Sequence, residues 1–282
     1  MTAIAPPARV DTPRSVPVTR LLGAELRWVL RRPRTLVMLA VFALVPVLIS
    51  VGVAVGDGTG HGLIGAVAGD GLVLPVVAIT VSLALLLPLA VAMVAADAIA
   101  GEAAQGTLRG LLLAPVGRLR LVAVKAFGVL VVATLAVLAL AVVGVLAGLL
   151  VVGDAEGHLV TLSGTTLDLD EALGRVALAV VWTIGQLAAV GAVALAVSAL
   201  TEHPSVVIAS VLGGLIVFGV LTAIPALEWL QPYLLTTGWT ASVDVLRDPM
   251  PTDGLLGSTL RALCYLALGA GLAVYRMLRR DV

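Results

Sequence analysis

Charge, aromatic residues and cysteine are all scarce in this sequence. Only 12% of its 282 residues are charged and 4% are aromatic, whereas about 25% of an average soluble domain is charged. These scarcities exclude an intrinsically disordered chain, a disulfide scaffold and a nucleic-acid-binding domain. The single cysteine, Cys264, has no Cys or His neighbour at metal-ligand spacing, so we expect a small buried residue there.

The sequence contains several long apolar runs. Five uninterrupted runs each reach the roughly 20 residues needed to cross a bilayer. A sixth is weaker because Arg261 lies in its first turn, where a long side chain can reach the membrane interface. The sequence therefore predicts an all-α polytopic membrane protein with six transmembrane helices. The predicted spans are residues 35–55, 72–96, 127–152, 176–200, 206–227 and 259–277.

The basic residues predict the orientation of these spans. With the N-terminus in the cytoplasm, 14 of the 17 basic residues fall on cytoplasmic segments, and only Arg175, Arg247 and Arg261 fall outside. Because Lys and Arg are retained on the cytoplasmic side, we expect both termini to be cytoplasmic. Sixteen arginines against one lysine suggest a GC-rich genome, so we expect a bacterial cytoplasmic (inner) membrane.

Ionisable residues are absent from the first five predicted spans. Proton-coupled carriers and ion pumps need such groups within the membrane, so any uphill transport must draw its energy from elsewhere. The most polar pair is Thr183 and Gln186, and we interpret Gln186 as a hydrogen-bonding contact between helices. Gly144 and Gly148, four residues apart, predict close helix packing.

The segment 17–34, before the first span, has the pattern of a helix lying in the membrane interface. Pro33 then turns the chain into the bilayer. A plain basic flank of the first span is the alternative interpretation. We expect a disordered tail over residues 1–16 and a cytoplasmic tail over 278–282. The apolar side of the interfacial helix carries Leu22, Leu26 and Val29 with Trp28 beside them, and the basic side carries Arg20, Arg27 and Arg31.

The connection between the second and third spans is the only long cytoplasmic loop of this prediction, and it reads DAIAGEAAQGTLRGLLLAPVGRLRLVAVK over residues 97–125. Gly101 and Gly106 are expected to break the descending helix. Asp97 and Glu102 are expected to pair with basic residues; a general acid–base role is the alternative, but no nucleophile, His or metal ligand lies near them. The candidate partners are Arg109, Arg118 and Lys125.

A short amphipathic helix is predicted next in this loop. Thr107 can cap it, and a turn containing Pro115 follows it. So short a helix is marginal in isolation, so its exposed leucines predict a partner surface. These leucines are Leu108, Leu111 and Leu112.

The loop pattern D-A-I-A-G-E-x-x-x-G-T-L-x-x-L-L-x-x-P-x-x-R, followed by Lys125, resembles the coupling-helix signature of ABC transporter permeases of the ABC-2 class. The ending Arg279–Val282 is similar to the tail of many such subunits. The resemblance is strongest to the branch that holds the permease of the copper-site maturation system of nitrous oxide reductase, and small drug and peptide exporters share the pattern.

The resemblance implies roles for three segments. Leu108–Leu113 would be a coupling helix docked on an ATPase subunit, 17–34 the elbow helix, and 228–257 an outer re-entrant region with Trp229, Tyr233 and Trp239 at interfacial depth. The compact 228–257 loop and the comparatively long 153–175 loop depart from the pattern. The implied coupling residues are Asp97, Gly101, Glu102, Gly106, Thr107, Leu108, Arg109, Leu111, Leu112, Pro115 and Arg118.

No G-x-x-x-x-G-K-[ST] motif is present, because the only lysine, Lys125, follows Ala123 and Val124. ATP and magnesium would therefore be held by a partner ATPase, and we expect no cofactor on this chain. The predicted function is the permease subunit, not an enzyme, of an exporter for an amphiphilic drug, lipid or peptide. The expected partners are an ABC ATPase, a second permease subunit as homodimer or heterodimer, and the bilayer, with no nucleic acid.

An intramembrane enzyme, a secondary carrier or a scaffold is the alternative function. An internal repeat would favour a carrier, and none is found. The histidines fall on different sides of the predicted membrane, so we predict no catalytic or metal site, although a cation could bind in an outer loop. The residues weighed for these roles are His203, His61 with Asp57 and Asp70, and His158 with Asp154 and Glu156.

Overall fold

A computed structural model describes residues 18–56, 63–106, 117–153 and 159–279. Among these residues, six helices are long and apolar enough to cross a membrane, and the only strands form a short antiparallel hairpin. The predicted all-α polytopic class is therefore confirmed. The elements are α1 (Val18–Leu30), α2 (Pro33–Val55), α3 (Leu63–Gly69), η1 (Gly71–Val73), α4 (Leu74–Ala84), α5 (Leu86–Ala96), η2 (Asp97–Gly101), α6 (Glu102–Ala104), α8 (Arg118–Ala147), η3 (Gly148–Val152), β1 (Leu159–Val160), β2 (Thr166–Leu167), α9 (Leu169–Leu200), α10 (Pro204–Ala223), η4 (Pro225–Tyr233), η5 (Thr236–Leu246) and α11 (Asp253–Arg279).

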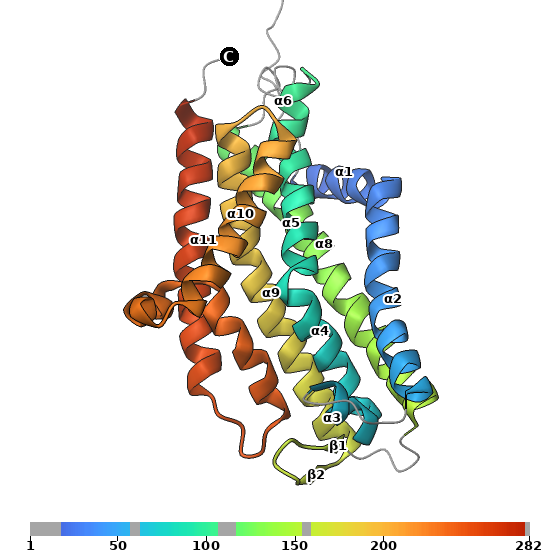
Figure 1. The fold of residues 1–282 in the computed structure, drawn as a ribbon. Coiled ribbons are helices and arrows are strands. Elements are labelled where there is room, and N and C mark those ends of the chain that lie inside the picture. Colours follow the sequence, from blue (N-terminus) through green and yellow to red (C-terminus); the bar gives the residue numbers. More distant parts are fainter. Residues whose placement is uncertain (1–17, 57–62, 107–116, 154–158, 280–282) are drawn as a thin grey trace, which may run out of the picture.

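The long helices run side by side, with α9 in the middle of the bundle (Figure 1). Helix α9 packs against α5, α8 and α11. Helix α1 lies across the bundle near one end, whereas α3 and the β1–β2 hairpin lie at the opposite end (Figure 1). Among the six candidate spans, α10 is the least enclosed, because only Val207 and Val211 of its 20 residues are buried.

The second predicted span, 72–96, is not one continuous helix. Leu85, with φ −150° and ψ −48°, separates α4 from α5. The cause is Pro88, whose ring cannot donate a backbone hydrogen bond and clashes with the carbonyl of Ala84 in a regular helix. Beyond residue 96 the helix continues through a π-helical turn, η2, into α6. The predicted break at Gly101 is therefore wrong, and the helix ends before Gly106, which has φ +71°.

The fifth predicted span, 206–227, ends early. Pro225 restricts the residue before it to an extended conformation, and Ile224 has φ −98° and ψ 108°. Helix α10 therefore stops at Ala223, and the chain continues through the 3₁₀ elements η4 and η5. Helices α8, α9 and α11 begin before the predicted spans, because hydropathy marks only the part of a helix inside the membrane.

Glycines set the close packing of the bundle. A Cβ added at Gly144 would lie 2.7 Å from the Cα of Pro75, and Gly148 meets the backbone of Gly71 directly. The predicted packing role of Gly144 and Gly148 is confirmed. Gly269 likewise allows close packing between α11 and α9, because an added Cβ would lie 2.6 Å from the carbonyl carbon of Ala192.

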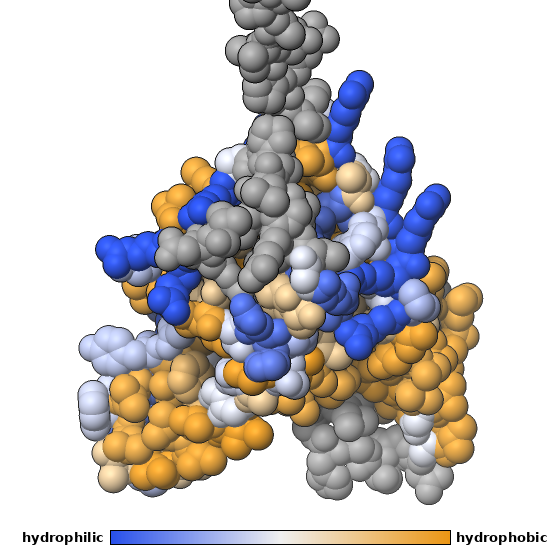
Figure 2. Space-filling model, turned by 90° about the horizontal axis from the view of Figure 1, so that it is seen from above, coloured by the Kyte–Doolittle hydropathy of each residue, from blue (hydrophilic) through white to orange (hydrophobic). Residues whose placement is uncertain are grey.

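Hydrophilic side chains cover the end that carries α1 and α6, whereas hydrophobic side chains cover much of the flanks (Figure 2). We call this the basic end. Described acidic residues, among them Asp168, Asp170 and Asp253, begin helices at the opposite end. The described basic residues of the basic end are Arg20, Arg27, Arg31, Arg32, Arg34, Arg118, Arg120, Lys125, Arg276 and Arg279.

Candidate functional site

Helix α1 packs against the start of α8 at the basic end. Val29 is buried, and Leu22 and Leu26 are half-buried. The helix ends at Leu30, and Pro33 is the first residue of α2, where its missing N–H costs nothing. The basic side chains on the other side of α1, those of Arg20, Arg27 and Arg31, are exposed.

A buried lysine joins α1 to α6 and α8. The Nζ of Lys125 lies 2.5 Å from Oε1 of Glu102 and 3.2 Å from both carboxylate oxygens of Glu25. The side chains are only 6% exposed for Lys125 and 11% for each glutamate. Because a buried charge is costly unless it is paired, the three side chains hold their elements together.

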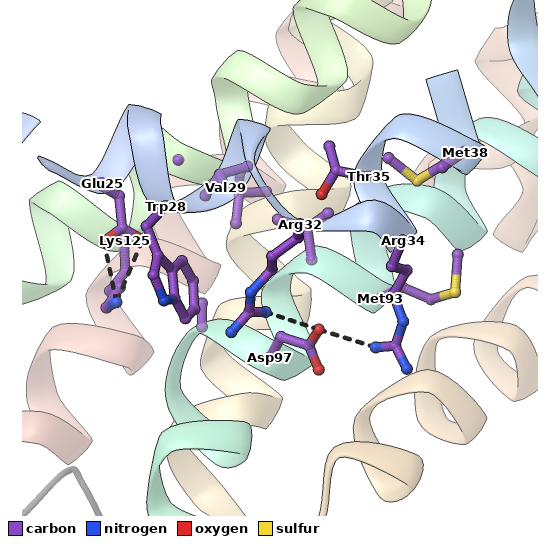
Figure 3. A pocket seen from close by; sticks show the side chains of 14 residues that line it. Glu25, Trp28, Val29, Arg32, Arg34, Thr35, Met38, Met93, Asp97 and Lys125 are labelled. Carbon is purple, nitrogen blue, oxygen red and sulfur yellow. Dashed lines mark hydrogen bonds and ion pairs between the residues drawn. The ribbon is translucent and has the colours of Figure 1, made fainter. Parts of the chain in front are cut away.

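A second ion pair joins the start of α2 to η2. Oδ2 of Asp97 accepts hydrogen bonds from Arg32 at 3.0 Å and from Arg34 at 2.9 Å. The two arginines flank Pro33, and their side chains converge on the carboxylate (Figure 3). The turn into the first span is therefore anchored to the end of the second.

Trp28 connects the two ion-pair groups. The guanidinium of Arg32 lies 3.3 Å from the centre of its ring, and Nζ of Lys125 lies 4.9 Å from that centre. Both are cation–π contacts. Trp28 stands between Lys125 and Arg32 (Figure 3). We call the whole set the ion-pair array. It consists of Glu25, Trp28, Arg32, Arg34, Asp97, Glu102 and Lys125.

The π-helical turn η2 explains how one helix supplies both carboxylates. Residues five apart share one turn of a π-helix, so Asp97 and Glu102 both face the α1–α2 connection. The N–H of Ala100 also donates to Oγ of Ser198 on α9, at 2.9 Å. Single π-turns occur frequently at functional sites.

A polar cavity of about 290 Å³ lies beside the array at the basic end. It opens next to the end of α6, close to where the described part of the chain stops at Gly106. Both carboxylates of the helix and both arginines of the α2 turn contribute to its wall. The lining residues are Arg32, Pro33, Arg34, Asp97, Gly101, Glu102 and Gln105.

The structure brings some of the predicted coupling residues together. Asp97, Gly101 and Glu102 line the polar cavity. Arg118 lies elsewhere and donates to the backbone carbonyl of Leu278 at 2.7 Å, which ties the start of α8 to the end of α11. The remaining predicted coupling residues, Thr107, Leu108, Arg109, Leu111, Leu112 and Pro115, lie outside the described residues, as does the predicted tail over 1–16. Of the tail predicted over 278–282, residues 278 and 279 belong to α11 and residues 280–282 lie outside the described residues.

The predicted membrane-interface aromatic residues separate into two groups. Trp229 and Tyr233, on η4, are 68% and 67% exposed. Trp239 is buried instead of lying at an interface, because η5 packs against α4, α9 and α11. Cys264 is likewise not the predicted buried residue, since it is exposed on α11.

Three partners in the array were not predicted from the sequence. The predicted pairing of Glu102 with Lys125 is confirmed, whereas Glu25, Arg32 and Arg34 were missed as partners. The available signal was Glu25, the only acidic residue in an otherwise basic segment 17–34. Oε1 of Gln186, whose amide was predicted to hydrogen-bond between helices, is buried without a partner among the described residues.

Only Asp70 and His203, of the histidines and neighbouring acids weighed for catalysis or metal binding, belong to the described residues. Among the described residues, no three His, Cys, Asp or Glu side chains could hold a metal ion together. The buried Asp70 accepts hydrogen bonds from the N–H groups of Leu72 and Val160, a structural role. His203 is exposed. The other candidates, His61, His158, Asp57, Asp154 and Glu156, lie outside the described residues.

Comparison with known proteins adds one match. A family model described as ABC-2 family transporter protein matches residues 20–246, from α1 to the end of η5. Comparison with curated proteins found no match. The family match includes every residue of the ion-pair array.

Proposed function

The chain belongs to the ABC-2 family of transporter proteins, and on this premise we propose that it is the permease subunit of an exporter driven by a separate ATPase subunit. It is a multi-pass membrane protein with six helices apolar enough to span. ATP and magnesium would bind to the partner, since the sequence lacks a phosphate-binding P-loop motif.

The ion-pair array is the observation that carries this proposal. A permease must convert movement of its ATPase into movement of its spans. The array links the helix that leads into the 107–116 segment with α1, the start of α2 and α8 through charged contacts. Closure of the ATPase would then shift the population of the spans between two states, because the partner binds one state better.

The proposed orientation places the basic end in the cytoplasm of a bacterial cell. Positive side chains gather at this end, as expected for the cytoplasmic face of an inner membrane. The exposed arginines of α1 would lie among lipid phosphates. The ATPase would dock on the 107–116 segment, through the leucines that the sequence places there.

A second permease subunit completes the proposed assembly. Helix α10 has only two buried residues, and its exposed side chains would contact the partner. The substrate would pass between the two subunits, and the apolar surface of the spans favours an amphiphilic molecule over an inorganic ion.

Co-purification with the ATPase tests this proposal. The ATPase used is the one encoded next to this chain, co-expressed with an affinity tag. We expect the double variant Leu108→Asp, Leu111→Asp to lose the ATPase on purification in detergent, because the charges disrupt an apolar docking surface. Leu278→Asp, on an exposed residue of the basic end, is the matched control and should retain it. Equal retention of the ATPase by both variants would contradict the docking assignment.

A further inference from the structure

The element η4 lies beside the middle of a membrane-spanning helix. Helix α11 has 27 residues, about 40 Å at 1.5 Å per residue. Near its midpoint, the hydroxyl of Tyr265 donates to the carbonyl of Tyr233 at 3.0 Å, and one turn closer to its start Arg261 donates to the carbonyl of Leu234, the residue after η4, at 2.7 Å. Figure 1 shows this segment as the orange coil that protrudes sideways between the two ends of the bundle. These contacts with α11 fix the position of η4 along that helix.

Three side chains of η4 are suited to contact a ligand: the carboxylate of Glu228 and the rings of Trp229 and Tyr233. Glu228 is exposed, and Trp229 and Tyr233 are 68% and 67% exposed. No residue of η4 is buried. A carboxylate facing lipid hydrocarbon is costly, and ionisable residues within a membrane face a water-filled path or a protein interior. This face of η4 therefore does not face lipid.

Glu228 has no cation to pair with among the described residues. The arginines outside the basic end are all engaged elsewhere. Arg175 and Arg247 form ion pairs with Asp248 and Asp244, and Arg261 donates to the carbonyl of Leu234 and the hydroxyl of Thr237. The carboxylate is therefore available for a positive charge supplied from outside the chain.

An apolar cavity of about 100 Å³ is lined by Leu235, two residues after the end of η4, and by Tyr265. Tyr265 connects the cavity to η4, because its ring lines the cavity and its hydroxyl holds the carbonyl of Tyr233. The cavity would take the apolar part of a ligand whose charge lies at Glu228. Its lining includes Val190, Val193, Val211, Leu215, Phe218 and Tyr265.

We propose that η4 faces the translocation path and binds an organic cation with an apolar body, through the carboxylate of Glu228 and the rings of Trp229 and Tyr233. The rings add cation–π attraction to the charge pairing. This inference rests on the proposed exporter function and names its substrate class.

Tetraphenylphosphonium is the probe, and tetraphenylborate, an anion of closely similar shape, is the matched ligand control. Binding is measured on the purified full chain in lipid nanodiscs, with binding to empty nanodiscs subtracted. We expect saturable binding of the cation only. Glu228→Gln should weaken it about tenfold or more, because one unscreened charge pair is lost. Trp229→Ala should weaken it less.

Glu171→Gln is the matched protein control, since Glu171 is an exposed glutamate in the first turn of α9, away from η4. Its affinity for tetraphenylphosphonium should equal that of the unmodified chain. Absence of saturable binding, equal affinity in Glu228→Gln, or equal binding of the borate would each overturn the proposal.

Water access to η4 gives a second readout that does not depend on the choice of probe. In a Cys264→Ser background, Glu228→Cys should react with a membrane-impermeant methanethiosulfonate reagent. The unmodified chain is the control, because Cys264 is exposed on α11 next to Tyr265 and should face lipid. Failure of the Glu228→Cys variant to react would overturn the water-facing assignment.

Failure of this inference differs from failure of the exporter proposal. Retention of the ATPase without tetraphenylphosphonium binding would remove the cation assignment and leave the permease. Loss of the ATPase from the unmodified chain would remove the exporter function itself, whatever the probe does.

Discussion

Lys125 lies 2.5 Å from Glu102 and 3.2 Å from Glu25, so one ammonium serves two carboxylates in a nearly buried position. These carboxylates come from α6 and α1, which are far apart in the sequence. Removal of the lysine leaves both acids near each other without a counter-charge. Its contribution is therefore larger than that of an exposed ion pair, which stabilises by about 0 to 1 kcal/mol.

Lys125→Met should destabilise the chain by about 3 to 5 kcal/mol, the cost of breaking a buried ion pair from one side. Denaturant titration in detergent, followed by tryptophan fluorescence, measures the change. Arg27→Met, at an exposed position of α1, should change stability by less than about 0.5 kcal/mol. Similar stability of the two variants would contradict the role of the array.

Double-mutant cycles should separate the two arginines that contact Asp97. Arg34 is 64% exposed and Arg32 is 29% exposed, and only Arg32 also lies over the Trp28 ring. We expect a coupling of about 1.5 kcal/mol between Arg32 and Asp97, and less than about 1 kcal/mol between Arg34 and Asp97. The reverse order would contradict the assignment of the stronger ion pair to the less exposed arginine.

Gly71→Ala should disrupt the packing of η1 against η3. An added Cβ would overlap the backbone of Gly148, and backbone cannot rotate away as a side chain can. We expect a loss at the upper end of about 1 to 3 kcal/mol, seen as a lower midpoint of thermal unfolding. Gly52→Ala is the control, because nothing lies within 4 Å of its Cβ position. A midpoint equal to that of the control would argue against this close approach.

Cysteine labelling in whole cells should establish the orientation. In the Cys264→Ser background, Ser163→Cys, in the exposed turn between β1 and β2, should react with an impermeant maleimide in intact cells. Gln105→Cys, exposed at the basic end, should react only after permeabilisation, because positive residues mark the cytoplasmic side. The opposite pattern would invert the proposed topology.

The spans could be predicted because a membrane-crossing helix must be apolar over about 20 residues. The points where these helices break or end could not be predicted, because hydropathy does not depend on backbone geometry. Residues around Leu85 are as apolar as their neighbours, and the break there comes from Pro88. In the same way, apolar residues continue past Ala223, although Pro225 ends α10.

The site could be predicted only in part. The acidic residues of the 97–125 loop were identifiable from their pattern, as was the nearby Lys125. Their partners on α1 and at the start of α2 could not be identified, because 65 residues separate Arg32 from Asp97 and 100 separate Glu25 from Lys125. Which side chains meet depended on the path of α1 across the bundle and on the π-helical turn.

The burial of Lys125 also gives the protein an unusual reactivity. It is the only lysine in the sequence, so amine-directed reagents have a single side chain to modify, and it is 6% exposed. Acylation of that amine requires it to leave both glutamates and lose its charge. The rate of acylation at Lys125 would therefore report, without any engineered label, how often the contacts between α1, α6 and α8 open.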